Sequence, residues 1–391
     1  MALTDAIRFF TEESKSLACM SIVCGNKNRS FRALGGVSDL EGSPVMDGSL
    51  FDLASVTKLF TAFLLLKLWE EGLLSMDDPV VQYAPMFKNL SGLSVLSLAA
   101  FETGIQTDGR VDACADRESA LGTLFTARNT PQGVRAYSDM HAMVLKYVIE
   151  GASGMPYMEY LRKTILRPLG MNHTFCTVPE AQRPLCVSTD REHRFEKGEY
   201  ILHRTPKGLP HDPKARVLYA GGDDCPGHAG LFSTAGDLEI LCRALLRYEV
   251  LTPRALAAMA LNRTGRKRAD GTWTQFLGLQ CYVKHPDQYF SEIPAFMGKH
   301  AIGISGFTGN HLAFDPDMGV FEFYLGSRVL NRLSVLVPEA GKTLSDYGLN
   351  GDGTGTFVWN DGERVLSSVD YVHLKDRHLH TETGAVLENL L

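Results

Sequence analysis

Ser55 and Lys58 stand three positions apart, directly ahead of the apolar run Leu59–Trp69. In a helix, residues at i and i+3 share a face, so the lysine amine can reach the serine hydroxyl. An amine that has lost its proton can act as the base that makes a serine nucleophilic, without a histidine. The run after Lys58 leaves almost no polar stripe, which indicates low-dielectric surroundings that favour the neutral amine. The pair therefore predicts an activated serine.

The same pair also has a purely structural explanation. A serine and a lysine with this spacing are expected about once by chance in a chain of 391 residues. Ser55 can simply cap the helix that follows, with Lys58 pointing into water. The apolar run argues against this explanation, because a solvated lysine normally lies on a polar stripe.

Tyr137-Ser138-Asp139 stands immediately before a helical run that starts at Met140. Ser138 or Asp139 can serve as the N-cap of that helix, since these residue types are preferred at helix starts. Tyr137 adds a chemical interpretation. A phenol beside a cationic lysine has a lowered proton affinity and can relay a proton to a leaving group. Both interpretations stay open.

A third candidate is the stretch Gly303–Gly309, which lies between strand-like flanks. A glycine-rich strand edge or turn needs no function. However, glycines let a ligand backbone approach closely, and an exposed strand edge can hydrogen-bond an extended acyl or peptide substrate. On its own this stretch is a weak signal.

Taken together, these motifs resemble those of the serine β-lactamase and penicillin-binding protein superfamily, particularly its class C-like branch of esterases, peptidases and β-lactamases. Phe51–Lys58 resembles the first motif, and Tyr137–Asp139 is a variant of the second, which is commonly Tyr-x-Asn. Ile304–Gly306 corresponds to the third motif but departs from its usual sequence. Further similar stretches are His211–Pro213, Gly227–Thr234 and Gly306–Gly309, and the resemblance covers roughly residues 15–335.

The resemblance implies a role for each matched residue. Ser55 would be the acylated nucleophile, Lys58 its base and Tyr137 the proton relay. Asp139 would stand where the family's asparagine contacts substrate or lysine. The backbone N–H groups of Ser55 and Phe307 would form the oxyanion hole, since fixed donors stabilise charge that develops on a carbonyl oxygen. The substrate-binding residues implied in this way are Asp139, Ile304, Ser305, Gly306 and Phe307.

Ile304 departs from the family pattern, which usually has lysine or histidine at this position. That cation helps to bind a carboxylate or to tune the tyrosine, so antibiotic hydrolysis becomes a weaker expectation. Candidates for a replacement charge are Lys299, His300 and His311. The main prediction is a serine hydrolase that acts on ester or amide bonds through a Ser55 acyl-enzyme. A degenerate ligand-binding protein without turnover, a β-lactamase and an acyltransferase of the same fold are the alternatives.

A metal-dependent enzyme is a rival from a different class, because several residues between positions 203 and 228 are of types that ligate zinc. No pair among them has a compact ligand spacing such as His-x-x-x-His, so we expect neither a metal nor another cofactor. The residues in question are His203, His211, Asp212, Asp223, Asp224, Cys225 and His228.

The composition is that of a globular protein, with 45% hydrophobic and 21% charged residues and a net charge of −6. It lacks the basic excess of a nucleic-acid-binding protein, so the expected partner is a small-molecule or short-peptide substrate. The run Leu59–Trp69 is too short for a membrane span. Eight scattered cysteines and a start without a basic, then apolar, leader favour a cytoplasmic location. The oligomeric state stays open.

The pattern of helices and strands expected around these residues predicts an α+β fold. Strand patterns occur at residues 18–24 and 30–36, and again at 276–283, 301–304, 310–315 and 319–326. We expect one antiparallel sheet, built from both ends of the chain and flanked by helices. This arrangement agrees with the β-lactamase/transpeptidase-like fold that the resemblance implies.

The division into domains follows from the same patterns. Residues 1–75 and 226–391 would form the sheet domain, and residues 76–225 an inserted, mainly helical domain. Prolines and histidines interrupt every pattern from about 172 to 225, which predicts a long irregular excursion. A hairpin around Asn360–Gly362 and a helix from about Ser368 are expected near the C-terminus.

Overall fold

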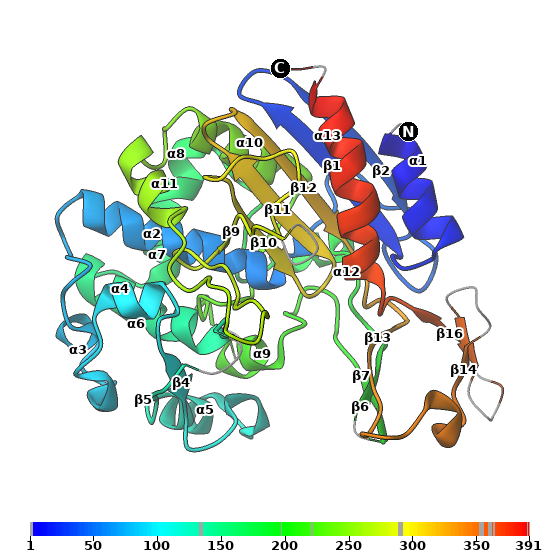
Figure 1. The fold of residues 1–391 in the computed structure, drawn as a ribbon, viewed down its shortest axis with the longest axis horizontal. Helices are drawn as coiled ribbons and strands as arrows, with labels where there is room; N and C mark the ends of the chain where they lie inside the picture. Colours follow the sequence, from blue (N-terminus) through cyan, green and yellow to red (C-terminus); the bar gives the residue numbers. More distant parts are fainter. Residues whose placement is uncertain are drawn as a thin grey trace.

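The computed structural model describes residues 3–132, 136–196, 198–219, 222–287, 292–351, 356–358, 362, 364–388 and 390. Its centre is a six-stranded sheet in the order β2-β1-β12-β11-β10-β9, in which each strand is antiparallel to its neighbours (Figure 1). Both ends of the chain contribute strands, so the predicted α+β sheet is confirmed. The strands are β1 (Cys19–Asn26), β2 (Ser30–Gly36), β9 (Tyr282–Val283), β10 (Ile302–Gly306), β11 (Asn310–Asp315) and β12 (Val320–Gly326).

Helices account for most of the remaining regular structure. The α-helices are α1 (Leu3–Arg8), α2 (Thr57–Glu70), α3 (Val80–Tyr83), α4 (Val95–Ala99), α5 (Arg117–Leu124), α6 (Asp139–Ser153), α7 (Tyr157–Leu161), α8 (Arg167–Leu169), α9 (Pro213–Tyr219), α10 (Ala235–Leu246), α11 (Pro253–Met259), α12 (Tyr371–Leu374) and α13 (His380–Glu388). The 3₁₀ and π helices are η1 (Phe9–Glu13), η2 (Ala54–Val56), η3 (Lys88–Leu90), η4 (Val111–Ala113), η5 (Arg162–Leu166), η6 (Glu180–Leu185), η8 (Leu344–Tyr347) and η9 (Lys375–Leu379).

The two faces of the central sheet pack against different helices. Alternation along a strand decides which side chain lies on which face. Leu312 and Phe323 belong to the main core, which also holds the apolar residues of α2 and α10. Ala313 and Tyr324 belong to a second core, with residues of α1 and α13. Figure 1 shows α1 and α13 side by side over that second face.

Helix α2 is buried along almost its whole length, as the apolar run predicted. Only Lys67, Trp69 and Glu70 near its C-terminal end are partly exposed. Full burial of one leucine or phenylalanine side chain contributes about 1.5–3 kcal/mol. The helix is therefore a rigid support for whatever its first turn carries.

A second sheet, in the order β14-β15-β16-β13-β6-β7, corrects the predicted irregular excursion. Two strands from that region pair with each other, and β6 also pairs in parallel with β13. The predicted hairpin near the C-terminus is present as β15 and β16, although its turn lies largely outside the described residues. The division into two domains stays a prediction. The strands are β6 (Glu192–Glu196), β7 (Glu199–His203), β13 (Arg332–Val337), β14 (Asn350–Gly351), β15 (Thr356–Val358) and β16 (Arg364–Ser367).

Four short strands complete the fold. They are β3 (Phe51–Asp52), paired with β8 (Phe232–Ser233), and β4 (Gly104–Gln106), paired with β5 (Arg128–Thr130). Within the described residues, no helix is long and apolar enough to cross a membrane. All eight cysteines are free thiols.

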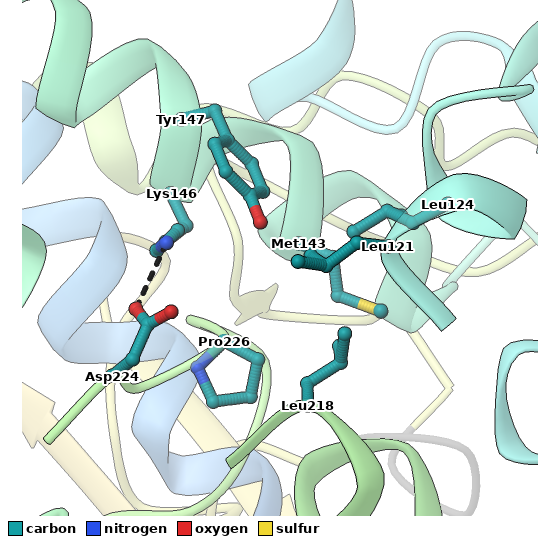
Figure 2. Close-up of a pocket in the computed structure, with 8 residues that line it drawn as sticks. All are labelled: Leu121, Leu124, Met143, Lys146, Tyr147, Leu218, Asp224 and Pro226. Atoms are coloured by element: carbon teal, nitrogen blue, oxygen red, sulfur yellow. Dashed lines mark ion pairs between the residues drawn. The ribbon is translucent and has the colours of Figure 1, made fainter. Parts of the chain in front are cut away.

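A small cavity beside α6 belongs to the packing of the helical region. Figure 2 shows Lys146 and Asp224 facing each other there, with Nζ and Oδ1 2.9 Å apart. The cavity holds only about 10 Å³, roughly the space of one water molecule. It is too small for a substrate, so this cavity is not a substrate-binding site.

Candidate active site

Ser55 lies in η2, at the turn between β3 and α2. The carboxylate of Asp52 holds this turn, because Oδ1 accepts a hydrogen bond from the Ala54 N–H at 2.9 Å and Oδ2 accepts one from the His211 N–H at 2.7 Å. Ala54 adopts a φ of 47°, in the left-handed region that residues with a side chain rarely occupy. Backbone strain of this kind persists where the surrounding structure fixes it, and it clusters at functional sites.

Lys58 lies one turn further along, and its side chain is fully buried. Its Nζ donates to Ser55 Oγ at 3.0 Å, to Asp139 Oδ1 at 2.7 Å and to the carbonyl of His228 at 3.2 Å. The structure thus brings the predicted nucleophile, its predicted base and Asp139 together. Asp139 contacts the lysine, which is one of the two contacts expected for it.

The protonation state of Lys58 differs from the expectation. Burial acts to lower the pKa of Lys58, but the charge of Asp139 and the hydrogen bonds to Asp139 and Tyr137 oppose it, and the pKa lies above the ordinary lysine value. The pKa of the Asp139 carboxyl is held well below its usual range by Lys58, His228 and Lys214, against the effect of burial. The pair therefore rests as an ammonium and a carboxylate. Desolvation alone would favour the neutral amine, and the partner charge of Asp139 reverses this preference.

Tyr137 completes the group. The Lys58 Nζ lies 4.8 Å from the centre of its ring, which stacks on Phe101 at 5.6 Å and on Tyr282 at 5.4 Å. Burial raises the pKa of Tyr137 above its ordinary value, while the charge of Lys58 and hydrogen bonds to Lys58 and Ser55 act to lower it. The phenol is therefore protonated at rest, close to the serine and the lysine.

Strand β10 brings the third motif to the same place. Ser305, Gly306 and Phe307 line the cleft that contains Ser55. A Cβ on Gly306 would lie 2.6 Å from the Leu53 carbonyl oxygen, so only glycine allows the strand to approach the Ser55 turn this closely. Ile304 points to the opposite face, where it is fully buried in the main core. The expectation that Ile304 contacts substrate is therefore not met, because β10 alternates its side chains between faces.

None of the three predicted replacement cations lines this cleft. His300 pairs at the surface with Asp317, with Nδ1 and Oδ2 2.6 Å apart. His311 is fully buried, and burial lowers its pKa well below the usual histidine value, so it is neutral. Lys375 lies there instead, and its Nζ donates to Ser305 Oγ at 2.9 Å and to Glu292 Oε2 at 2.8 Å. It comes from η9, far along the chain from β10.

The two remaining motif stretches support the catalytic groups. Besides the His228 carbonyl at Lys58, the Gly227 carbonyl accepts a hydrogen bond from Thr61 of α2 at 2.6 Å. The His228 ring lies 2.9 Å from Asp212 Oδ1. The His211 ring stacks on Phe307 at 5.6 Å. These contacts join the loop before β8 to the start of α2 and to Asp212, and they join the segment before α9 to the residue that follows β10.

The cleft holds about 460 Å³, a size typical of sites for small ligands. Most of its charged lining could not be predicted from the sequence, because these residues come from separate loops, helices and strand β6, with no shared motif. These missed residues are Arg110, Asp112, Arg194, Lys214, Glu292, Arg328 and Lys375. A local signal was present only for Lys214, which follows the recognised His211–Pro213 stretch.

The residues considered as possible ligands of a metal ion do not form one site. Asp224 pairs with Lys146 and Arg117, and Asp223 pairs with Arg162. Asp212 and His228 do come together with Asp139, in a group whose ligand atoms could hold a metal ion. However, Lys58 Nζ lies 2.7 Å from one oxygen of Asp139 and Lys214 Nζ lies 3.1 Å from the other. Two ammonium groups on these ligand atoms oppose cation binding.

A second group with potential metal ligands lies between the sheet and the C-terminal helices. It consists of His311, Glu322 and His380, all buried. His380 Nδ1 lies 2.5 Å from Glu322 Oε1, and the charge of Glu322 helps to raise the pKa of His380 against the effect of burial. The geometry is that of a buried hydrogen-bonded ion pair, which fastens α13 to β12.

Comparisons with known proteins agree with this geometry. A sequence model of the Beta-lactamase family matches residues 7–334. A relative from Escherichia coli (strain K12), named "Putative D-alanyl-D-alanine carboxypeptidase", is 30% identical over 55% of this chain and 56% of its own length. A relative of the same name from Salmonella gallinarum is 27% identical over 72% of this chain and 69% of its own length. The chain thus matches only about half of the first relative.

Solved structures show the same fold. A hydrolase with promiscuous acyltransferase activity, EstCE1, has a TM-score of 0.65 at 18% identity and covers 83% of this chain and 92% of its own. A class C beta lactamase from Rhodobacter sphaeroides has a TM-score of 0.62 at 20% identity, with 83% and 93% covered. The family match spans most of the chain and includes all three motifs of the cleft. The chain therefore belongs to the Beta-lactamase family.

Proposed function

We propose that this protein hydrolyses ester or amide bonds of small acyl or short-peptide substrates through an acyl-enzyme on Ser55. The observation that carries the proposal is the distance of 3.0 Å between Ser55 Oγ and Lys58 Nζ, at the floor of a cleft that Tyr137 also lines. Nucleophile, proton acceptor and relay are within reach of one another, which is the geometric requirement for covalent catalysis.

The reaction has two halves. Ser55 Oγ attacks the carbonyl carbon while its proton passes to Lys58 or Tyr137, whichever is deprotonated. The tetrahedral intermediate then collapses, and the departing alcohol or amine takes that proton. Water attacks the acyl-serine ester in the second half, releases the carboxylic acid and restores the Ser55 hydroxyl. The backbone N–H groups of Ser55 and Phe307 are the proposed donors to the developing oxyanion.

The relatives support ester and amide substrates without choosing between them. The curated relatives are named for cleavage of a D-alanyl-D-alanine peptide, and one structural neighbour is a hydrolase with acyltransferase activity. The wide cleft is compatible with each, because pocket shape and access of the acceptor decide among these activities. A cytoplasmic location, suggested by the cysteines, stays a prediction.

A second candidate is a ligand-binding protein that has lost turnover. The buried ion pair between Lys58 and Asp139 favours it, because an ammonium cannot accept the serine proton. The family's asparagine would carry no charge at position 139. Turnover then requires the minor fraction of the protein in which Lys58 or Tyr137 has lost its proton.

The test is a substrate panel for the wild type, Ser55→Ala and Tyr137→Phe: p-nitrophenyl acetate, p-nitrophenyl butyrate, an acyl-D-alanyl-D-alanine peptide and a penicillin. We expect wild-type turnover of at least one substrate and a loss of about 10³-fold or more in Ser55→Ala. Binding without turnover in the wild type would favour the second candidate. Activity that survives Ser55→Ala and disappears with a chelator would overturn the proposal.

A further inference from the structure

The Asp139 carboxylate has an ammonium group beside each of its two oxygens. Lys58 Nζ of α2 lies 2.7 Å from Oδ1, and Lys214 Nζ of α9 lies 3.1 Å from Oδ2. The Lys58 side chain is fully buried next to Ser55, whereas 23% of the Lys214 side chain is exposed in the cleft. One carboxylate is therefore shared between a buried ammonium at the nucleophile and a second ammonium that water can reach.

Local structure fixes Lys214 at the start of α9. Asp212 Oδ1 accepts a hydrogen bond from the Ala215 N–H at 2.8 Å, and Oδ2 of the same carboxylate lies 3.6 Å from Lys214 Nζ. The His228 ring also contacts this carboxylate, at 2.9 Å. Burial acts to lower the pKa of Lys214, but the charges of Asp212 and Asp139 keep it above the ordinary lysine value. Lys214 is therefore an ammonium with two carboxylate neighbours.

The second ammonium changes what happens when Lys58 loses its proton. A buried charge that loses its only partner is strongly destabilised. Without Lys214, the Asp139 carboxylate would be such a charge whenever Lys58 is neutral, and this penalty would keep the proton on Lys58. With Lys214 on its other oxygen, the carboxylate keeps a counter-ion during the proton transfer. The same positive charge favours a deprotonated Tyr137, because a nearby cation stabilises a phenolate.

We propose that Lys214 is a positioning residue for the proposed reaction, which holds the second oxygen of Asp139 and so allows the proton of Ser55 to be accepted in the cleft. This inference rests on the proposed function for the role of Ser55. It removes the objection that a permanently paired Lys58 leaves no base, because Asp139 does not depend on Lys58 alone. Lys214 acts through Asp139 and needs no contact with the substrate.

The remaining titratable groups around the two lysines set the pH range for a test. Burial acts to raise the pKa of Asp212, but contact with His228 holds it well below its usual range. The hydrogen bond from Arg110 lowers the pKa of Asp112. His141 is neutral, because burial lowers its pKa to about 4. A test above about pH 8 therefore follows the lysines and the phenol, since ordinary histidines titrate at about 6.5.

The test follows the rate at which a fluorophosphonate modifies Ser55, measured by intact mass from about pH 8 to about pH 10.5. Ser55 Oγ forms a bond to phosphorus, fluoride leaves and the serine proton passes to the base, so the rate rises as the base is deprotonated. Lys214→Met and Lys214→Gln both remove the charge. Each should displace the rising limb by about one pH unit towards higher pH, which is a loss of about tenfold at a given pH. Lys214→Arg keeps the charge and should stay close to the wild type.

A compensating variant separates charge from packing. Asp139→Asn removes a negative charge and should displace the limb towards lower pH, so Asp139→Asn/Lys214→Met should lie closer to the wild type than either single variant. Packing lost at Lys214 would not be restored by this second substitution. A double variant at least as slow as Lys214→Met would therefore overturn the inference.

The matched control is Lys207→Met. Lys207 Nζ lies 2.9 Å from Asp39 Oδ2 and 29% of its side chain is exposed, but it is not among the described residues that line the cleft. Its substitution should leave the dependence of the rate on pH unchanged. Equal curves for the wild type and Lys214→Met, or a Lys214→Arg variant as slow as Lys214→Met, would overturn the inference alone. A wild type that the fluorophosphonate does not modify on Ser55 would overturn the proposed function as well.

Discussion

Lys58 Nζ and Asp139 Oδ1 lie 2.7 Å apart in the floor of the cleft, and they form an ion pair in which the lysine side chain is fully buried. The same ammonium lies 3.0 Å from the Ser55 hydroxyl. The charge that anchors the lysine therefore also controls when it can accept the serine proton.

Asp139→Asn should move the activity profile to lower pH. The charge of Asp139 acts to raise the pKa of both Lys58 and Tyr137. Without the charge of Asp139, the group that accepts the serine proton, Lys58 or Tyr137, loses its own proton at lower pH. The pH at half-maximal kcat/KM should fall by about one unit or more. Asp317→Asn, which removes the carboxylate of an exposed pair with His300, is the control and should leave the profile unchanged. An unshifted profile in Asp139→Asn would show that neither group is the acceptor.

The ion pair between Lys58 and Asp139 should stabilise the fold only in a middle range of pH. Its contribution should be lost at both low and high pH. The pKa of Asp139 is lowered in the folded state, so its contribution is present above the unfolded value of about 3.9 and is lost as pH falls. The pKa of Lys58 is raised, so its contribution is present below about 10.4 and is lost as pH rises through the folded value. Urea unfolding of the wild type and Asp139→Asn should give a difference in free energy that shrinks below about pH 4. A difference that grows there would contradict this sign.

Gly306→Ala should reduce catalytic activity more than it reduces the stability of the fold. The new methyl group would lie 2.6 Å from the Leu53 carbonyl oxygen, so the end of β10 must move away from the Ser55 turn. A misplacement of about 1 Å at a catalytic centre can reduce the rate about 10²-fold. Gly48→Ala is the control, because a Cβ at Gly48 has no neighbour within 4 Å. Equal kcat/KM values for the two variants would argue against a role for the β10 approach.

The sequence predicted the local motifs well, and the structure explains why. Ser55 and Lys58 are three residues apart where η2 leads directly into α2, so their spacing alone brings their side chains together. The strands of the central sheet have apolar patterns that can be read locally. Strand β6 could not be found in this way, because Glu192–Glu196 is mostly polar and pairs with β13, which lies over a hundred residues later.

The charges around the cleft could not be predicted from the sequence either. Whether Lys58 is neutral depends on Asp139, a partner from another helix, whose charge acts to raise the pKa of Lys58 against the effect of burial. Lys375 reaches Ser305 from the C-terminal helices, beyond the last residue of the family match. Contacts of this kind follow from the assembled fold, in which the C-terminal segment covers the second face of the sheet.

Ala54 should tolerate glycine but not valine. Its φ of 47° suits glycine, and the strain in a residue with a side chain amounts to about 1–2 kcal/mol. We expect Ala54→Gly to change the free energy of unfolding by less than about 1 kcal/mol. Ala54→Val should lower that free energy further than glycine does and reduce acylation of Ser55. Chemical denaturation and a stopped-flow ester assay measure the two effects, and a valine variant with full stability and activity would refute the strain argument.

The most direct test of the central claim is intact-mass analysis after exposure to a fluorophosphonate, followed by peptide mapping. We expect one adduct per wild-type chain, located on Ser55, and none on Ser55→Ala under the same conditions. An unmodified wild-type protein, or an adduct of equal yield in Ser55→Ala, would contradict a nucleophilic role for Ser55.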